Sequence, residues 1–291
     1  MFDNNCFYNL KKRSLIRING KDKFSFLQGI ISNDIHILKE NNSIYSSILT
    51  PQGRFIADFF VTNYKDSLLL EVHESCKDII IGKLQMYKLR SDVEISTCKD
   101  FYILLVSKFS NDFYSNVLNT DLLYFDDPRF NNYFKRLYLF KGLEKNIFDE
   151  IGMKEISTMD FNELRFENVI PDFHIDVLKN KSLLMEMRFD DLNGISWTKG
   201  CYMGQEITAR MKYRNLMKRN LFQIKIDFNS NIEDSLNVND KEIGHITSHN
   251  RKNGFAYINL NYFKEYGMKT LLCGDSKIKI LEPWWKKEIK K

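Results

Sequence analysis

The spacing of apolar residues predicts short β-strands through the first hundred positions of the chain. Apolar and polar residues alternate in residues 13–18, and the turn-forming pair Asn19-Gly20 follows them. Thr50 to Gly53, with the sequence TPQG, is expected to join two strands as a hairpin. The strands are expected at residues 13–18, 43–49, 54–62, 68–72, 93–95 and 101–106.

Two helices are expected among these strands. Asp22 is a candidate N-cap for a short helix that Gly29 ends. Residues 75–89 have helical periodicity. The apolar positions expected to share one side of this second helix are Ile79, Ile80, Leu84 and Tyr87. The mixture of antiparallel strands and helices predicts an α+β fold.

The pattern changes toward the end of the chain. Residues 158–169 predict a helix, with Thr158 as its candidate N-cap. After Arg219 the chain consists of short strand patterns separated by turns, and no helix is needed. This predicts a small β-barrel or sandwich. We therefore expect a domain boundary near residue 216, with domains at residues 1–215 and 216–291.

Composition and charge narrow the class of protein. Of the 291 residues, 43% are hydrophobic, which excludes an intrinsically disordered chain. The net charge of +5 is weaker than the concentrated charge of dedicated nucleic-acid-binding proteins. It suits an anionic small molecule or a transient RNA contact equally well. The densest basic run, Arg210 to Arg219, is either part of such a contact or a solvated face.

The cysteines indicate free thiols in a reducing compartment. The five cysteines are scattered and include no C-x-x-C pair, which argues against a zinc ribbon or a redox dithiol. His245 and His249 fall in a strand-turn pattern rather than on a helix, so we expect no intrinsic metal site. No apolar run is long enough for a transmembrane helix, and the first residues resemble neither a secretory nor a transit signal. We expect a cytoplasmic monomer without membrane contact.

Residues 199–206, with the sequence KGCYMGQE, hold the strongest candidate chemistry. The pattern from Tyr202 onward predicts a helix, which would put Cys201 at or just before a helix N-terminus. The helix dipole and the positive charge of Lys199 would there favour a reactive thiolate with a lowered pKa. The alternative is a small buried cysteine that only packs. Neither His174 nor His245 has a spacing that identifies it as a catalytic base.

The residues around Cys201 fit a second kind of chemistry. Gly200 and Gly204 allow the backbone to approach a ligand closely or to adopt a positive φ. Gln205 and Glu206 carry groups that hydrogen-bond the amino-pyrimidinone edge of pterins and purines. The alternative for Glu206 is an exposed first-turn carboxylate that stabilises the helix dipole.

Several ordered segments resemble one known family. KGCYMGQE resembles the K-G-C-[FY]-x-G-Q-E motif of the YgfZ-type folate-binding proteins, which are relatives of the glycine-cleavage T-protein. Its companions follow the family's order along roughly residues 15 to 220. They are NGKDKFSFLQGIISND from Asn19 to Asp34, LTPQGRFIADFFV from Leu49 to Val61, YKLRSDV from Tyr87 to Val93, and LRFENVIP from Leu164 to Pro171.

The resemblance implies a fold and a ligand. The fold would be T-protein-like: two interleaved α+β subdomains and a C-terminal small β-barrel around a central channel that holds tetrahydrofolate, or a folate loaded with a one-carbon unit. Two departures, Asn168 and Asp172, stand where the family usually has glycine. The candidate folate-binding residues, in addition to the reactive Cys201, are Glu206, Gln205, Arg165, Glu186, Lys199, Gly200 and Tyr202.

The resemblance also implies a function. The family is tied to the maturation or repair of iron–sulfur proteins, including tRNA-modifying enzymes, and the motif cysteine separates it from true aminomethyltransferases. We therefore expect a folate-binding accessory factor with transient iron–sulfur client or assembly partners and no glycine-cleavage activity. The alternatives are a folate-dependent one-carbon transferase acting on an amine, a thiol or tRNA, and a docking module that no longer binds folate. RNA is a further candidate partner, although no RNA-binding motif supports it.

Overall fold

The structure is a computed structural model that describes most of the chain. The described residues are 6–38, 43–106, 122–130, 135–141, 153–178, 181–239, 241–266 and 270–286. Contacts between Cα atoms divide the chain into two compact units, each built from separate stretches. The first comprises Met1–Leu49, Ala57–Thr158 and Asn193–Met203, and the second comprises Thr50–Ile56, Met159–Leu192 and Gly204–Lys291. The domain division at residue 216 stays a prediction.

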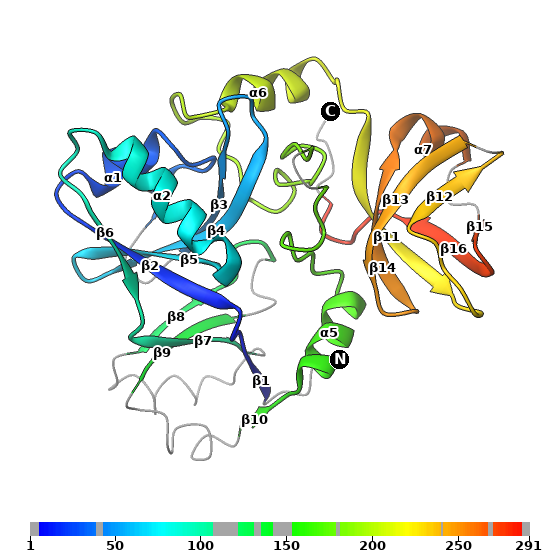
Figure 1. The fold of residues 1–291 in the computed structure, drawn as a ribbon, viewed down its shortest axis with the longest axis horizontal. Coiled ribbons are helices and arrows are strands. Elements are labelled where there is room, and N and C mark those ends of the chain that lie inside the picture. The colour runs from blue at the N-terminus through cyan, green and yellow to red at the C-terminus, as the bar shows by residue number, and fades with distance from the viewer. Residues whose placement is uncertain are drawn as a thin grey trace. The chain divides into compact units, whose positions relative to one another are not determined.

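The first unit contains a five-stranded sheet in the order β3-β4-β5-β2-β6, shown in Figure 1. Its β4–β5, β5–β2 and β2–β6 pairs are antiparallel. The strands expected at these places from the spacing of apolar residues are confirmed. Their bounds are β2 Arg13–Asn19, β3 Ser43–Leu49, β4 Phe55–Tyr64, β5 Ser67–His73 and β6 Glu94–Cys98.

A second sheet in the same unit has the order β10-β1-β7-β9-β8. Of its strands, only β7 was expected from the sequence. Leu15 and Leu69 from the first sheet pack with Phe101 and Tyr138 from the second in one buried cluster. The bounds are β1 Cys6–Asn9, β7 Phe101–Val106, β8 Leu122–Asp126, β9 Lys135–Phe140 and β10 Lys154–Glu155.

Among the described residues, four short or medium helices accompany these sheets. They are α1 Lys23–Gln28, η1 Ile35–Ile37, η2 Glu74–Cys76 and α2 Lys77–Lys88. Asp22 precedes α1, but its carboxylate accepts a 2.7 Å hydrogen bond from the backbone N–H of Asp92 instead of capping the helix. Both helices expected in this half are confirmed. The assignment of Ile79 to the buried side of α2 is wrong, because its side chain is 54% exposed while Ile80 and Leu84 are buried.

A buried ion network ties the two sheets of the first unit together. Glu71 on β5 is fully buried, and its carboxylate accepts hydrogen bonds from Arg13, Arg136 and Tyr138. The Arg136 guanidinium also contacts Asp127 and lies 3.8 Å from the centre of the Phe60 ring. Burial alone would raise the pKa of Glu71, but the two guanidinium groups hold that pKa below its usual value.

The second unit contains a six-stranded sheet that curls into a nearly closed barrel. Its order is β12-β13-β14-β11-β16-β15, and the end strands β12 and β15 also contact each other. The thiol of Cys273 on β15 donates to the carbonyl oxygen of Glu233, just before β12. The expected barrel is confirmed. The bounds are β11 Arg219–Asp227, β12 Ser235–Val238, β13 Lys241–His249, β14 Asn253–Asn259, β15 Thr270–Cys273 and β16 Ser276–Leu281.

The described part of the second unit contains most of three helices, which are α5 Thr158–Glu167, α6 Gln205–Tyr213 and α7 Leu260–Tyr266. Because α7 follows β14 directly, the expectation that no helix is needed after Arg219 is wrong. Leu260, Tyr262 and Phe263 pack against the barrel core, which explains why this stretch is helical rather than a polar turn. Thr158 is the first residue of α5 rather than the cap that precedes it. No helix of the described residues is long and apolar enough to cross a bilayer.

The ion network predicts a large cost for removing its central carboxylate. Glu71→Gln leaves two buried guanidinium groups short of a counter-charge, so we expect a loss of about 3–5 kcal/mol in the free energy of unfolding. Because the pKa of Glu71 is lowered in the fold, its contribution is present at neutral pH and is lost as the pH falls through the acidic range. Urea unfolding at several pH values measures both effects.

The exposed ion pair of Lys252 and Glu163 supplies the control. Lys252→Gln should change the free energy of unfolding by less than about 1 kcal/mol, because exposed pairs contribute little. Equal costs for the two substitutions would contradict the role given to the buried network.

Candidate functional site

Cys201 lies on an exposed turn ahead of α6. It is the one cysteine classed as exposed among the described residues. The helix begins at Gln205, and Gly204 before it has φ +79°. This left-handed conformation interrupts the helical backbone, so the expectation that the helix starts at Tyr202 is wrong. Cys201 therefore precedes the helix by four positions, and its thiolate character stays a prediction.

Lys199 anchors this turn to an upstream segment of the same unit. Its ammonium group donates to the carbonyl oxygens of Gln28, Ile31 and Asn33 at 2.7, 2.8 and 2.9 Å. An ammonium has three donors, so these contacts satisfy it fully. Burial lowers the pKa of Lys199 to about 8, and Asp34 opposes this shift. The side chain is thus a buried cation that holds the backbone in place.

The ISND part of the first motif holds the rest of the loop. The Asn33 amide donates to the carbonyl oxygens of Tyr45 and Asn193, both at 2.8 Å. The Ser32 hydroxyl donates to the carbonyl oxygen of Gly194 at 2.7 Å. Farther along, the backbone N–H of Met203 donates to the carbonyl oxygen of Gly29. Two motifs that lie far apart in the sequence therefore form one hydrogen-bonded structure around Cys201.

The TPQGR turn supports the start of α6 within the second unit. Gly53 closes the turn through its N–H to the carbonyl oxygen of Thr50 and has φ +70°. A Cβ at Gly53 would lie 2.7 Å from the Cβ of Ile207. Glycine is required here on both counts, because the backbone conformation and the close approach of α6 each exclude a side chain.

Tyr202 and Gly200 flank the cysteine with opposite environments. Tyr202 is buried, and its ring centre lies 5.0 Å from the Lys199 nitrogen, close enough for a cation–π contact. A Cβ built on Gly200 would meet no protein atom within 4 Å. The backbone at Gly200 therefore has open space beside it within the described part of the protein.

Arg165 in the second unit is engaged by its own surroundings. It is buried, and its guanidinium donates to the Asp176 carboxylate at 2.7 Å and to the carbonyl oxygen of Ile170. A further bond reaches the hydroxyl of Ser248 on β13. These contacts brace the loop that contains the departures Asn168 and Asp172. The role of Arg165 as a folate contact stays a prediction.

Glu186 is a second buried group of that unit. Its carboxylate accepts a 3.2 Å hydrogen bond from Arg219, and its backbone carbonyl oxygen accepts from the N–H of Leu221 on β11. Burial raises the pKa of Glu186, and Arg219 acts against the shift. The pairing connects the irregular segment around residue 186 to the barrel.

Gln205 and Glu206 form the first turn of α6. Glu206 is exposed, so its carboxylate can accept hydrogen bonds from a solute. Gln205 is half-buried. Of the predicted folate-binding residues, Lys199, Gly200 and Tyr202 thus belong to the first unit with Cys201, and the other four belong to the second.

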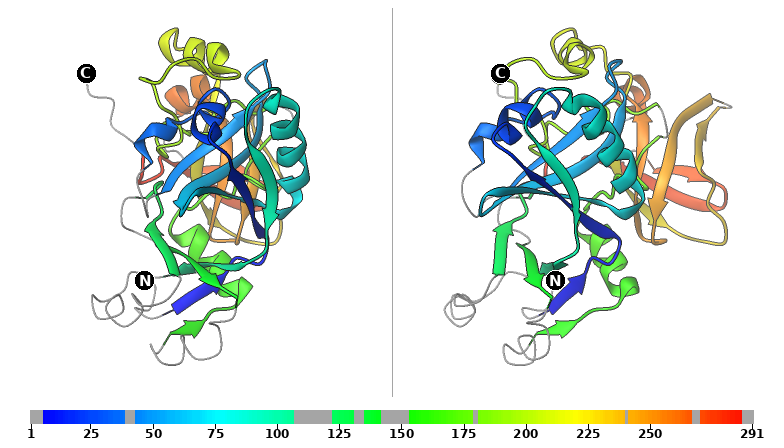
Figure 2. Two further views of the ribbon diagram at one scale, coloured as in Figure 1. Left: turned by 90° about the vertical axis from the view of Figure 1, so that its left-hand side faces the viewer. Right: turned by 60° about the vertical axis from the view of Figure 1, so that its left-hand side comes forward.

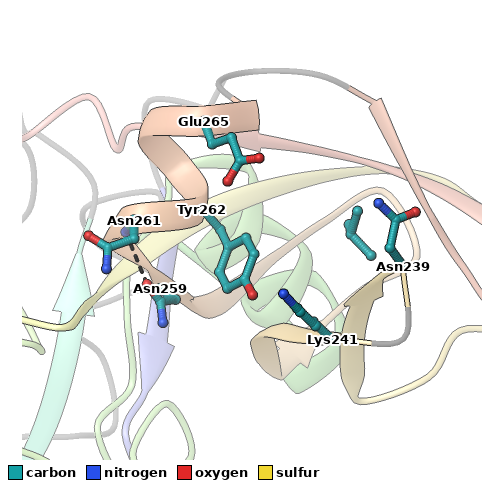
Figure 3. Close-up of a pocket in the computed structure, with 7 residues that line it drawn as sticks. Asn239, Lys241, Asn259, Asn261, Tyr262 and Glu265 are labelled. Carbon is teal, nitrogen blue, oxygen red and sulfur yellow. Dashed lines mark hydrogen bonds between the residues drawn. The ribbon is translucent and has the colours of Figure 1, made fainter.

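Two hollows in the described surface are lined by none of these residues. One, drawn in Figure 3, has a volume of ≈ 460 Å³ and is polar. Its lining includes Lys241 from β13, Asn259 from β14, and Tyr262 and Glu265 from α7. The other lies beside Leu89. No group of three or more potential metal ligands occurs among the described residues.

Sequence reasoning missed several residues that build the Cys201 turn. Ser32, Asn33, Asn193 and Gly194 were not among the candidates, although they position the loop directly. The available signal was the ISND segment itself, which carries polar residues inside an otherwise apolar stretch. Such residues hydrogen-bond when buried and therefore mark an internal contact.

The chain is similar in sequence to two groups of proteins. It is 26% identical over 255 residues to the mitochondrial iron-sulfur cluster assembly factor IBA57 homolog of Dictyostelium discoideum, covering 75% of this chain and 62% of that protein. It is 27% identical over 262 residues to the tRNA-modifying protein YgfZ of Buchnera aphidicola, covering 82% and 81%. The YgfZ protein of Hamiltonella defensa is 29% identical over 72% of this chain and 66% of its own.

The matched region spans less than two thirds of the first IBA57 relatives' length. No protein-family model matches the sequence. Among solved structures, the chain resembles the glycine cleavage system aminomethyltransferase T of Bartonella henselae, with a TM-score of 0.80 and 12% identity over 97% of this chain and 86% of that one. The expected T-protein-like fold and the resemblance to the YgfZ-type family are confirmed.

The Lys199 contacts predict that this side chain controls the order of the Cys201 turn. Lys199→Met leaves three carbonyl oxygens without their donor, so we expect a loss of about 3 kcal/mol in the free energy of unfolding. We also expect faster amide exchange at Met203, whose N–H is bonded to the same upstream segment. Urea unfolding and hydrogen exchange measure the two effects.

Lys212→Met is the matched control, because the Lys212 ammonium makes a partly exposed ion pair with Asp190 and lies outside the Cys201 turn. Its amide exchange at Met203 should equal that of the unmodified protein. Unchanged exchange in Lys199→Met would refute the anchoring role.

Proposed function

We propose that this chain, a homologue of the IBA57 and YgfZ proteins, is an accessory factor in the maturation or repair of iron–sulfur proteins. The relatives are named for iron–sulfur cluster assembly and for tRNA modification. In this proposal the thiol of Cys201 is the reactive group, and the iron–sulfur cluster is the cargo that the protein handles. We propose that this protein acts in a reducing compartment, the cytoplasm. The IBA57 relatives are named as mitochondrial.

The observation that carries the proposal is the exposed thiol on a braced loop. Cys201 is exposed, whereas Cys6, Cys98 and Cys273 are buried. The loop that presents it is held by the buried ammonium of Lys199. A thiolate is both a nucleophile and a soft ligand for iron–sulfur clusters, and it must reach its target from an accessible position. A fixed and accessible thiol suits brief contact with a cluster or with a client protein.

Reduced folate is the proposed second ligand. Some of the candidate residues have groups that suit it, whereas others are bonded within the protein. The exposed carboxylate of Glu206 suits the donor-rich edge of a pterin, and Gln205 precedes it on the same helix turn. The side-chain N–H groups of Lys199 and Arg165 donate hydrogen bonds to acceptors of the protein itself. We therefore assign ligand contact to Glu206 and Gln205 in the second unit and to the open backbone of Gly200 in the first. Within the first unit we assign Lys199 and Tyr202 to the support of the Cys201 turn, and within the second we assign Arg165 and Glu186 to the support of the segments around them. A reduced folate would supply one-carbon or redox chemistry when bound.

Cys201→Ser tests the role of the thiol. In cells that lack the endogenous relative, we expect the unmodified chain to restore the activity of an iron–sulfur enzyme and Cys201→Ser to reduce this restoration at least about tenfold. Cys76→Ser is the matched control, since Cys76 is half-buried and lies outside the motif. Full restoration by Cys201→Ser at equal protein level would contradict the proposal.

Calorimetry with tetrahydrofolate tests the second ligand. We expect binding by the unmodified protein and about tenfold weaker binding by Glu206→Ala, which loses a charge-assisted hydrogen bond of about 1.5–3 kcal/mol. Glu163→Ala removes an exposed carboxylate on α5 and should bind as the unmodified protein does. Absence of binding at millimolar ligand would remove folate from the account, and turnover of a one-carbon folate with an amine, thiol or tRNA would favour a transferase.

A further inference from the structure

Helix α2 carries apolar side chains on two opposite sides. Ile80 and Leu84 are buried against the rest of the first unit, where α2 contacts β2 and β6. Ile79 and Met86 are each 54% exposed, and Leu89 directly after the helix is 88% exposed. In the left view of Figure 2, α2 lies along one face of the sheet formed by β3, β4, β5, β2 and β6. The second apolar side therefore has no partner within the described part of this unit.

The exposed positions form one continuous stripe. Ile79, Gly82 and Met86 follow one another at steps of three and four residues, which is the spacing of a helix-packing seam, and Leu89 comes directly after the helix. A Cβ on Gly82 would meet nothing within 4 Å, so the centre of the stripe is shallow and accessible. A second helix can approach closely at such a position.

Leu89 has a strained backbone conformation, and the burial of its own side chain does not offset that strain. Its backbone has φ +45° and ψ −109°, in the region that favours glycine. Residues with a strained backbone persist when the surrounding structure fixes their conformation, and they cluster at functional and binding sites. The Leu89 side chain is almost fully solvated, so it buries almost no apolar surface that could offset the strain. The strain points to a use of the leucine outside the chain.

The charges around the stripe indicate the chemistry of its partner. Lys83, Lys88 and Arg90 lie along its second half, and none of them pairs with a carboxylate among the described residues. Asp78 lies at the opposite end, beside Ile79. An open hollow of ≈ 840 Å³ adjoins Leu89 and is lined in part by Arg90, Ser25 and Ser91. Asp22 also lines this hollow, and Asp92 nearby pairs with Lys21, so the three basic residues leave the Leu89 end positive overall. At the start of α2 the charge of Lys77 is paired with Glu74, which leaves Asp78 as a net negative charge.

We propose that this stripe, defined by Ile79, Gly82, Met86 and Leu89, is a docking surface for an amphipathic helix of another protein. The partner helix runs antiparallel to α2. Its first turns are acidic and lie beside Lys88 and Arg90, and its apolar residues cover Met86 and Leu89. Antiparallel packing also places opposite helix-dipole ends together. The surface is separate from the Cys201 turn, so this proposal does not depend on the proposed function.

Two synthetic helical peptides with the same leucine spacing test the surface. One carries glutamates in its first two turns, and the other carries lysines there. Fluorescence anisotropy should show that the full chain binds the acidic peptide at least about tenfold more tightly than the basic one. Met86→Lys and Leu89→Lys should each weaken binding of the acidic peptide about tenfold. Leu272→Lys, at a 67% exposed leucine on β15, is the control and should bind as the unmodified chain does.

A second variant separates docking from folding. Leu89→Gly relieves the left-handed strain, so it should raise Tm while weakening the binding of the acidic peptide. A lower Tm would overturn the strain argument. Equal binding of the two peptides, or binding that Met86→Lys and Leu89→Lys leave unchanged, would overturn the proposal. So would a chain dimer that Leu89→Lys dissociates, or phosphatidylserine vesicles binding more tightly than the acidic peptide, since each identifies a different occupant.

Discussion

The contact between the Lys199 ammonium and three backbone carbonyl oxygens is the constraint on which the Cys201 turn depends. Carbonyl groups that converge on one point repel one another unless a cation satisfies them. The lysine supplies that cation from residue 199 to a segment at residues 28–33, and Cys201 follows two positions later. One buried charge thereby converts an irregular turn into a fixed support for an exposed thiol.

The same physical solution recurs through the longest irregular part of the described chain. Residues 168–178 and 181–204 contain no helix or strand, so the backbone groups that turn hydrogen bonds leave unpaired need partners from side chains. Arg165 satisfies the carbonyl oxygen of Ile170, and Asn33 and Ser32 satisfy those of Asn193 and Gly194. Polar side chains at fixed places thus replace the hydrogen bonding that regular structure would supply.

The sequence predicted the regular elements well and the start of α6 poorly. Short runs rich in apolar residues and bounded by turn residues located β2 to β7, and β3, β4 and β5 are buried on both faces. Strands β8 and β9 were not predicted, because the stretch before residue 135 is rich in Asn and because the pairing of these strands is set by tertiary contacts. The start of α6 was missed because the left-handed backbone of Gly204 is a conformational choice that periodicity does not reveal. The motif identified Cys201, but only the fold shows that Lys199 is a support, since spacing does not specify a hydrogen-bond partner.

The most direct test of the account is the rate of alkylation of each cysteine in the native protein, followed by mass spectrometry. The account predicts that Cys201 reacts first, well before the buried Cys6, Cys98 and Cys273, because only an accessible thiol forms a reactive thiolate readily. Reaction of Cys201 no faster than that of the buried cysteines would contradict an exposed thiol on a fixed turn and, with it, the proposed role of this residue.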